Sequence, residues 1–197
     1  MKIFLSWSGE PSRQIAAELR TWLPFVVPGL RPWLSHEDIP KGARWSATLG
    51  RELEDTHFGI VCVTPANQDS EWLHYEAGAL GKFIDRSHVA PVLFGLELED
   101  LSGPLTQYQL TVFEQRDMNR LIDTLAAAVG SSPSAPAAPF FNLWWPKLER
   151  AVSPLIAQYR VAKLQRLGLI EPDEDGESWY LTEEGLQVVV EENLLDH

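Results

Sequence analysis

Cysteine is almost absent from this sequence of 197 residues, which contains only Cys62. A single cysteine excludes a disulfide within the chain and argues against a thiolate metal site. It lies in the apolar run 60–63, which is typical of a small side chain in a buried strand. The histidines at positions 36, 57, 74 and 88 have no metal-ligand spacing with Cys or Asp partners, so no metal site is predicted.

Long hydrophobic runs are also missing. No apolar segment approaches the length of a membrane span, so no membrane partner is expected. The first residues contain one lysine and a short apolar run, without a long apolar stretch or a cleavage pattern, which does not fit a signal peptide. From these absences we expect a soluble, cytoplasmic protein.

Basic residues are absent after Arg166. Ten of the 28 acidic residues lie from Glu171 onward, so the net charge of −12 is concentrated at the C-terminal end and the rest of the chain is close to neutral. Binding to phosphate backbones needs clustered positive charge. The distribution therefore argues against nucleic acid as a partner.

Short apolar runs alternate with segments of helical periodicity over the first 130 residues. We expect strands at 2–6, 30–34, 58–64, 89–94 and 110–113, and helices at 12–23, 45–55, 70–83 and 118–129. This alternation predicts an α/β domain with a parallel sheet over residues 1–130.

Residues 131–139 are rich in Ser, Pro and Ala and are predicted to form a linker. Residues 140–160 contain an aromatic helix, expected at 141–159 and packed on the core of the domain. Residues 161–197 are expected to form a small α+β appendage of helix, hairpin and helix, similar to the second half of a winged helix. Its wing is acidic, so a packing or oligomer contact is the more natural role.

One pair of residues indicates a site. Trp72 and Glu76 are four positions apart, which places them on the same face of the predicted helix at 70–83, and Ser70 is suited to cap it. An indole partly desolvates a neighbouring carboxylate, which disfavours the charged form of that carboxylate. The alternative for Glu76 is a surface acid that pairs with Lys82 or Arg86.

The chain resembles a TIR domain of the bacterial stand-alone type. The resemblance is carried by the opening Ile3-Phe4-Leu5-Ser6, the loop 38–42 followed by Trp45, the strand 59–64, and the sequence Asn67…Ser70…Trp72…Glu76-Ala77-Gly78-Ala79. It covers about the first 130 residues. It implies a flavodoxin-like fold, a parallel five-stranded sheet with helices on both faces.

Enzymatic TIR domains cleave NAD between nicotinamide and ribose, with NAD as the substrate and no further cofactor. The resemblance assigns the essential carboxylate to Glu76 and the companion aromatic to Trp72. The loop Ser6-Trp7-Ser8 borders the same pocket, and the loop 35–44 corresponds to one that moves during assembly. Some members hydrolyse NAD, and others make a cyclic ADP-ribose-type signal that activates a separate antiviral effector, as in Thoeris-like antiphage systems. Members also self-associate through TIR surfaces.

The residues suit this chemistry. Nicotinamide departs from NAD as a neutral group and needs no proton, so one carboxylate, Glu76, can be enough where ordinary glycosidases use two. That carboxylate would stabilise the oxocarbenium-like charge of the transition state. Trp72, Trp7 and Trp45 are candidates for the walls that stack on the planar rings, although the spacing of Trp45 with Leu49 and Leu53 also suits a core residue.

Two other functions remain open. The first is a TIR domain that only recruits protein partners and has no enzymatic role. The second is a nucleoside deoxyribosyltransferase-like enzyme on the same general fold, against which the loop 38–42 argues. For the enzyme, the residues are compatible with both outcomes, hydrolysis of NAD by water and cyclisation by a nucleophile of the same nucleotide.

Overall fold

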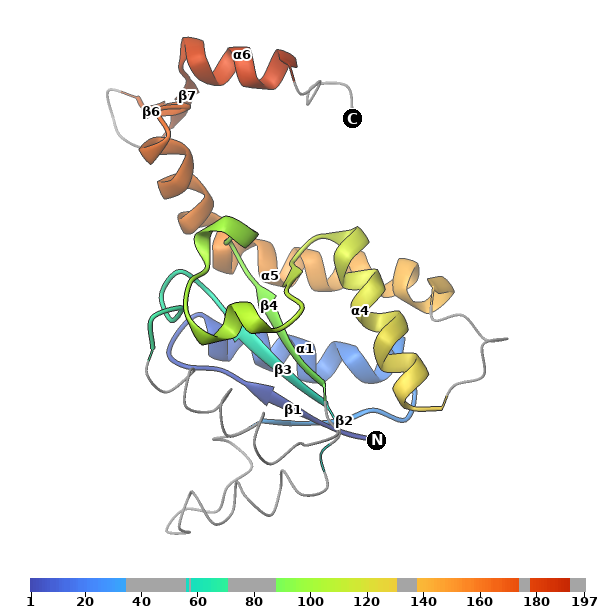
Figure 1. Cartoon of the computed structure of the whole chain (residues 1–197). Helices are drawn as coiled ribbons and strands as arrows, with labels where there is room; N and C mark the ends of the chain where they lie inside the picture. The colour runs from blue at the N-terminus through green and yellow to red at the C-terminus, as the bar shows by residue number, and fades with distance from the viewer. Residues whose placement is uncertain (35–55, 57, 71–87, 131–137, 174–177, 192–197) are drawn as a thin grey trace. The chain divides into compact units, whose positions relative to one another are not determined.

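A computed structural model describes residues 1–34, 56, 58–70, 88–130, 138–173 and 178–191. These residues form two compact units, Met1–Leu155 and Ile156–His197, which we describe separately (Figure 1). The helices expected at 45–55 and 70–83, and the loop at 35–44, lie outside the described residues.

The first unit is built on a five-stranded parallel sheet. Its strands are β1 (Lys2–Ser6), β2 (Arg31–Leu34), β3 (Phe58–Val63), β4 (His88–Leu93) and β5 (Thr111–Val112), in the order β2-β1-β3-β4-β5. This is the flavodoxin-like order. The predicted fold class is confirmed, and each strand lies within about a residue of its predicted bounds.

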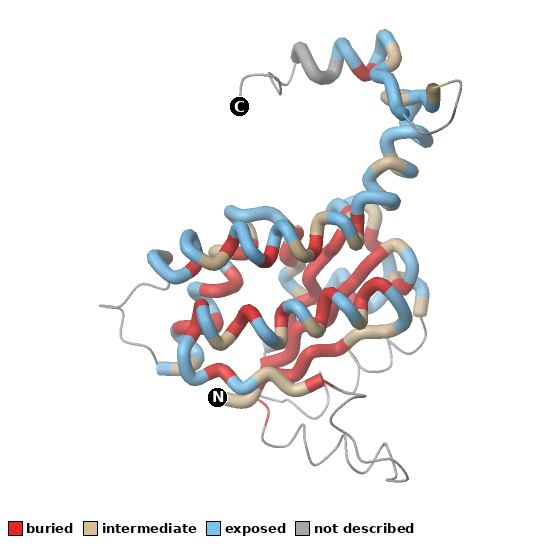
Figure 2. Tube along the Cα trace, turned by 180° about the vertical axis from the view of Figure 1, so that it is seen from behind, coloured by how far each residue is buried: buried red, intermediate tan, exposed pale blue. Residues whose placement is uncertain are grey.

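The central strands are apolar because both of their faces are covered. All six residues of β3 are buried, and so are four of the five in β1. A parallel strand covered on both faces has no polar side to alternate with its apolar side. Figure 2 shows the buried residues concentrated along these strands.

Two helices follow the predicted periodicity. Helix α1 (Ser12–Val26) runs three residues beyond its predicted end, and α4 (Gln115–Ala128) begins three residues before its predicted start. Two short 3-10 turns, Leu98–Asp100 and Pro104–Gln107, precede β5. Residues spaced three or four apart on α1 are buried, so one side of the helix faces the core: Ile15, Ala16, Leu19, Trp22, Leu23 and Val26.

Helix α5 (Ala138–Arg166) is longer than predicted and begins within the expected linker. Pro139 lies in its first turn, where the missing N–H has no helical acceptor in any case. A buried stripe at positions 141, 145, 148 and 152 packs this helix into the core of the first unit. The ring of Phe141 lies edge-on to Trp22, and the ring of Trp145 lies 5.1 Å from that of Phe113.

The second unit has the predicted order of helix, hairpin and helix. After the end of α5 come β6 (Ile170–Pro172), β7 (Trp179–Leu181) and α6 (Glu183–Glu191), with the two strands antiparallel. Thr182 caps α6 by accepting a hydrogen bond from the N–H of Gly185 at 3.0 Å. The unit boundary falls inside α5, whereas the sequence suggested boundaries at 130, 139 and 160, which stay predictions.

Among the described residues, no helix combines the length and the apolar character that crossing a membrane requires. The same part of the chain holds no cluster of three or more His, Cys, Asp or Glu side chains that could bind a metal ion.

Candidate functional site

The expected site lies where the chain changes direction in the sheet. From β1 the chain passes to β2 on one side and then returns to β3 on the other side of β1. Ligands in open α/β sheets bind outside the carboxyl ends of the strands at such a point. The residues that leave β1 and β3 here are Ser6–Gly9 and Thr64–Ser70, since Ser6 pairs with Val61 in the register.

The three residues predicted to border the pocket differ in exposure. Ser6 is fully buried at the end of β1, whereas Trp7 and Ser8 are partly exposed. The next residue, Gly9, has a φ of +69°, which a residue with a side chain rarely adopts. Trp7 and Ser8 are therefore the members of this loop that a ligand could touch in the observed conformation.

Hydrogen bonds from α1 hold the backbone of Ser8. The buried Ser12 hydroxyl accepts from the N–H of Ser8 at 3.0 Å. The same hydroxyl lies 3.0 Å from the carbonyl of Ser8 and 3.1 Å from that of Gly9, and it donates its proton toward this pair. The first turn of α1 thus fixes one side of the loop.

The turn after β3 holds the other side of the loop. Asn67 is buried, and its Nδ2 donates to the carbonyl of Ser8 at 3.2 Å and to the carbonyl of Cys62 at 3.0 Å. Its Oδ1 accepts from the N–H of Thr64 at 2.7 Å. The hydroxyls of Ser8 and Ser70 share a further hydrogen bond at 3.1 Å.

The sequence did not assign Asn67 or Ser12 to the site. Asn67 was part of the family resemblance only, and Ser12 was simply the first residue of a helix. An Asn in a Pro-containing turn directly after a buried strand is suited to bond the local backbone, which is the signal that was available. Its bond to Ser8, 59 residues earlier, depends on the pairing of β1 with β3.

Three predicted site residues, Trp45, Trp72 and Glu76, lie outside the described residues. Of these, Trp72 and Glu76 come two and six residues after Ser70 in the sequence. The chain therefore enters their segment from the turn that contacts the loop after β1. Thr64–Ser70 contains one carboxylate, Asp69, and a second, Glu10, directly follows Ser6–Gly9. Both are exposed, and Glu10 pairs with Arg13.

The thiol of Cys62 is not part of a reactive site. Its side chain is fully buried in β3, and this burial raises the pKa of the thiol because the thiolate would lose its hydration. A thiol that stays protonated is a poor nucleophile and a poor metal ligand. This agrees with the structural role that the sequence predicted.

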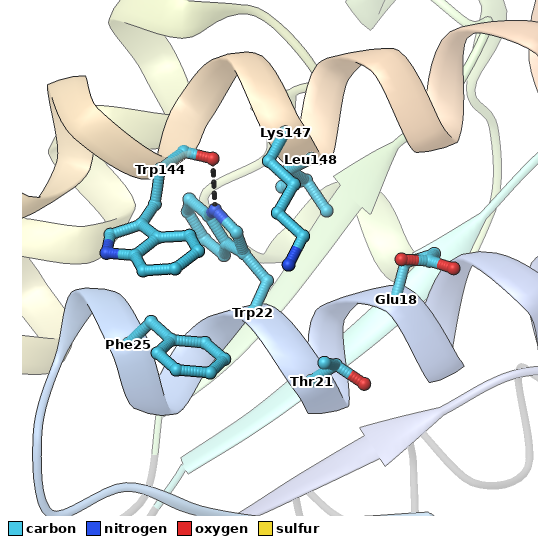
Figure 3. A pocket seen from close by; sticks show the side chains of 7 residues that line it. All are labelled: Glu18, Thr21, Trp22, Phe25, Trp144, Lys147 and Leu148. Atoms are coloured by element: carbon cyan, nitrogen blue, oxygen red, sulfur yellow. Dashed lines mark hydrogen bonds between the residues drawn. The ribbon is translucent and has the colours of Figure 1, made fainter.

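Two hollows of the first unit are lined by residues outside the loop after β1 and the turn after β3. A groove between α1 and α5 is lined by the stacked rings of Phe25 and Trp144 and by Lys147, whose ammonium lies 5.2 Å from the centroid of the Trp144 ring (Figure 3). Its free space is about 20 Å³, room for roughly one water molecule. A hollow of about 510 Å³ beside Lys2, Arg31 and Trp33 lies at the amino ends of β1 and β2, the opposite edge from Ser8.

Comparison with known proteins gives one family. The sequence model that describes the TIR domain matches residues 3–125, more than half of the chain. No curated protein matches this chain. Among solved structures, it is similar to the TIR domains of the activated Roq1 resistosome that directly recognizes the pathogen effector XopQ. The identity is 12%, the match covers 75% of this chain and 98% of that chain, and the TM-score is 0.42.

Proposed function

The chain belongs to the TIR domain family, and we propose that it is an enzyme that breaks the bond between nicotinamide and ribose in NAD. The observation that carries this proposal is the loop after β1. It lies at the point where the sheet changes direction, and its partly exposed Ser8 is bonded to the turn from which the Trp72 and Glu76 segment starts. This edge of the sheet is where such folds bind nucleotides.

In this proposal Glu76 supplies the only carboxylate that the reaction needs. Nicotinamide leaves as a neutral molecule, so no acid has to protonate it. As the glycosidic bond lengthens, positive charge develops on the ribose, and a preorganised carboxylate stabilises that charge more than it stabilises bound NAD. Trp72, Trp7 and Trp45 would stack on the planar rings and keep water away from the reacting bond.

The fate of the ribosyl cation decides the biological role. Capture by water gives ADP-ribose, and capture by a nucleophile of the same nucleotide gives a cyclic ADP-ribose-type signal. We propose a role in bacterial antiviral defence, similar to Thoeris, in the cytoplasm. There the protein would deplete NAD or reach a separate effector protein through the nucleotide signal, and it would self-associate through TIR surfaces when active.

The test is to incubate the purified full chain with NAD and to resolve the products by chromatography and mass spectrometry. Glu76→Gln keeps the size of the side chain and removes its charge, so the rate should fall on the order of 100-fold or more. The melting temperature should stay the same. Glu149→Gln, the same change on an exposed position of α5, is the control and should keep the rate. Full turnover by Glu76→Gln would refute the assignment.

A role as a protein-interaction module is the second candidate. Three large apolar side chains on α1 and α5 are exposed, Phe25 at 46%, Phe140 at 50% and Leu143 at 70%. Phe140 and Leu143 are one helical turn apart on α5, and Phe25 stacks on the neighbouring Trp144. A contiguous exposed apolar patch is a common mark of a protein contact surface. If the wild type releases no nicotinamide at any protein concentration, this candidate replaces the enzymatic one.

A further inference from the structure

We infer that Asn67 is a positioning residue, which latches the loop after β1 in the geometry that the NAD reaction needs. The inference rests on the proposed function and adds a residue that acts through Ser8 without touching the substrate. The inference starts from the three hydrogen bonds that the buried side chain of Asn67 makes.

Most of the contacts of Asn67 build its own turn. Its Oδ1 accepts from Thr64 N–H at 2.7 Å, and one Nδ2 hydrogen reaches Cys62 O at 3.0 Å. Its backbone N–H donates to Thr64 O at 3.0 Å, and its carbonyl accepts from Ser70 N–H at 2.9 Å. These bonds give the side chain one fixed orientation, so its remaining Nδ2 hydrogen points in a fixed direction.

That remaining hydrogen crosses to the other segment. It reaches the carbonyl of Ser8 at 3.2 Å, which the Ser12 hydroxyl also approaches from α1. The Ser8 hydroxyl is bonded to Ser70 at 3.1 Å. Ser8 is thus bonded both to the first turn of α1 and to the turn after β3. Of the two residues of that turn that bond Ser8, Asn67 and Ser70, only Asn67 is buried.

A buried carboxamide is a suitable latch for a partly exposed loop. Water competes more for the Ser8–Ser70 hydroxyl pair, in which both residues are partly exposed, than for the bond from Asn67 to Ser8, which is partly buried but has a buried side chain as its donor. Without the latch, the bonds from α1 still hold one side of the loop, but Gly9 allows the loop to sample other backbone conformations, because glycine accepts φ values on both sides of zero. A displacement of about 1 Å at a reacting site can cost on the order of 100-fold in rate.

The test uses Asn67→Asp in the full chain. This change keeps the Oδ1 acceptor and replaces Nδ2 by an oxygen, which faces the two carbonyls of Ser8 and Cys62 and repels them. The control is Asn142→Asp, the same change on an exposed position of α5. Three quantities are measured for each variant: hydrogen exchange of peptides covering residues 6–9, the melting temperature, and kcat and KM for NAD well below melting.

We expect hydrogen exchange in residues 6–9 to become roughly 10-fold faster, since one lost hydrogen bond is worth up to about that factor. We expect kcat to fall about 10-fold or more with a smaller change in KM, because a loop that samples several conformations still binds NAD but seldom holds it in the reactive geometry. A loss of stability alone would leave kcat unchanged at temperatures where the variant is folded.

Ser70→Ala and Ser70→Thr keep the test decisive if Asn67→Asp fails to fold. Ser70→Ala removes the weaker link to Ser8 and should have the same effects at smaller size, whereas Ser70→Thr keeps the hydroxyl and should restore the rate. Unchanged exchange at residues 6–9 would overturn the latch. Faster exchange with full kcat would overturn its role in the reaction. If the wild type does not cleave NAD, the proposed function fails, and exchange alone decides whether Asn67 latches the loop.

Discussion

Two adjacent tryptophans on α5 should differ more than twofold in what they contribute to the free energy of unfolding. Trp145 is 3% exposed, and its ring lies 5.1 Å from that of Phe113 and 5.4 Å from that of Phe141. Trp144 is half-buried and stacks on Phe25, at 4.5 Å, on the surface of the first unit. The same substitution at neighbouring positions therefore separates core packing from surface stacking.

The expected magnitudes follow from burial. Trp145→Ala leaves a cavity beside the rings of Phe113 and Phe141 and should cost about 4 kcal/mol. That cost corresponds to a melting temperature lower by about 8–16 °C for a chain of this size. Trp144→Ala should cost about 1.5 kcal/mol, from one stacked pair and the Lys147 cation above it. The hydrogen bond from Trp22 remains, because its acceptor is the backbone carbonyl of residue 144.

Urea unfolding followed by circular dichroism at 222 nm would measure both values without relying on tryptophan fluorescence. The urea midpoint and slope should be fitted to the transition of the first unit, which contains both tryptophans, since the two compact units can unfold separately. An equal or larger loss for Trp144→Ala would refute the packing described for α5. So would a loss below about 1.5 kcal/mol for Trp145→Ala, because a tryptophan buried in a core costs more than that.

Three further outcomes are expected. NAD cleavage should rise more steeply than linearly with protein concentration or should need an activator, and strict proportionality in a sample shown to be monomeric by light scattering would contradict assembly of the active form. Duplex DNA should not bind at physiological salt, since no Lys or Arg follows Arg166, and a tight, salt-sensitive gel shift would contradict this. Cys62 should not react with a thiol reagent at neutral pH until urea unfolds the chain, because burial raises its pKa; rapid native labelling would show that β3 opens locally.

The fold could be predicted because the strand-forming segments are recognisable from their local sequence. The run 58–63 is apolar at every position except Gly59, and its neighbours in sequence are polar, so its burial on both faces follows from its composition. The length of α5 was harder to predict. Pro146 and Pro154 lie inside this helix, where proline usually breaks the hydrogen-bond ladder, and residues 160–166, which are polar and apolar in turn, continue it as far as Arg166.

The site was predictable in part. Its loop, Ser6–Ser8, could be located because residues after a parallel strand gather at one edge of the sheet. The hydrogen bonds that hold this loop could not be predicted in this way. Asn67 meets Ser8 only after two strands 55 residues apart have paired in a defined register, and no local pattern encodes that distance.

The late position of α5 has a consequence for the order of events during synthesis. The indole of Trp22 bonds to a carbonyl 122 residues further along the chain. At about 5–20 residues per second, roughly 6–24 s pass on the ribosome between the appearance of these two groups. For most of that interval Trp22 lacks the ring of Phe141 that covers it, and Phe113, once it is made, lacks the ring of Trp145 until 32 further residues have been added. The nascent chain therefore exposes aggregation-prone aromatic surface, which chaperones can shield, until translation of the first unit is nearly complete.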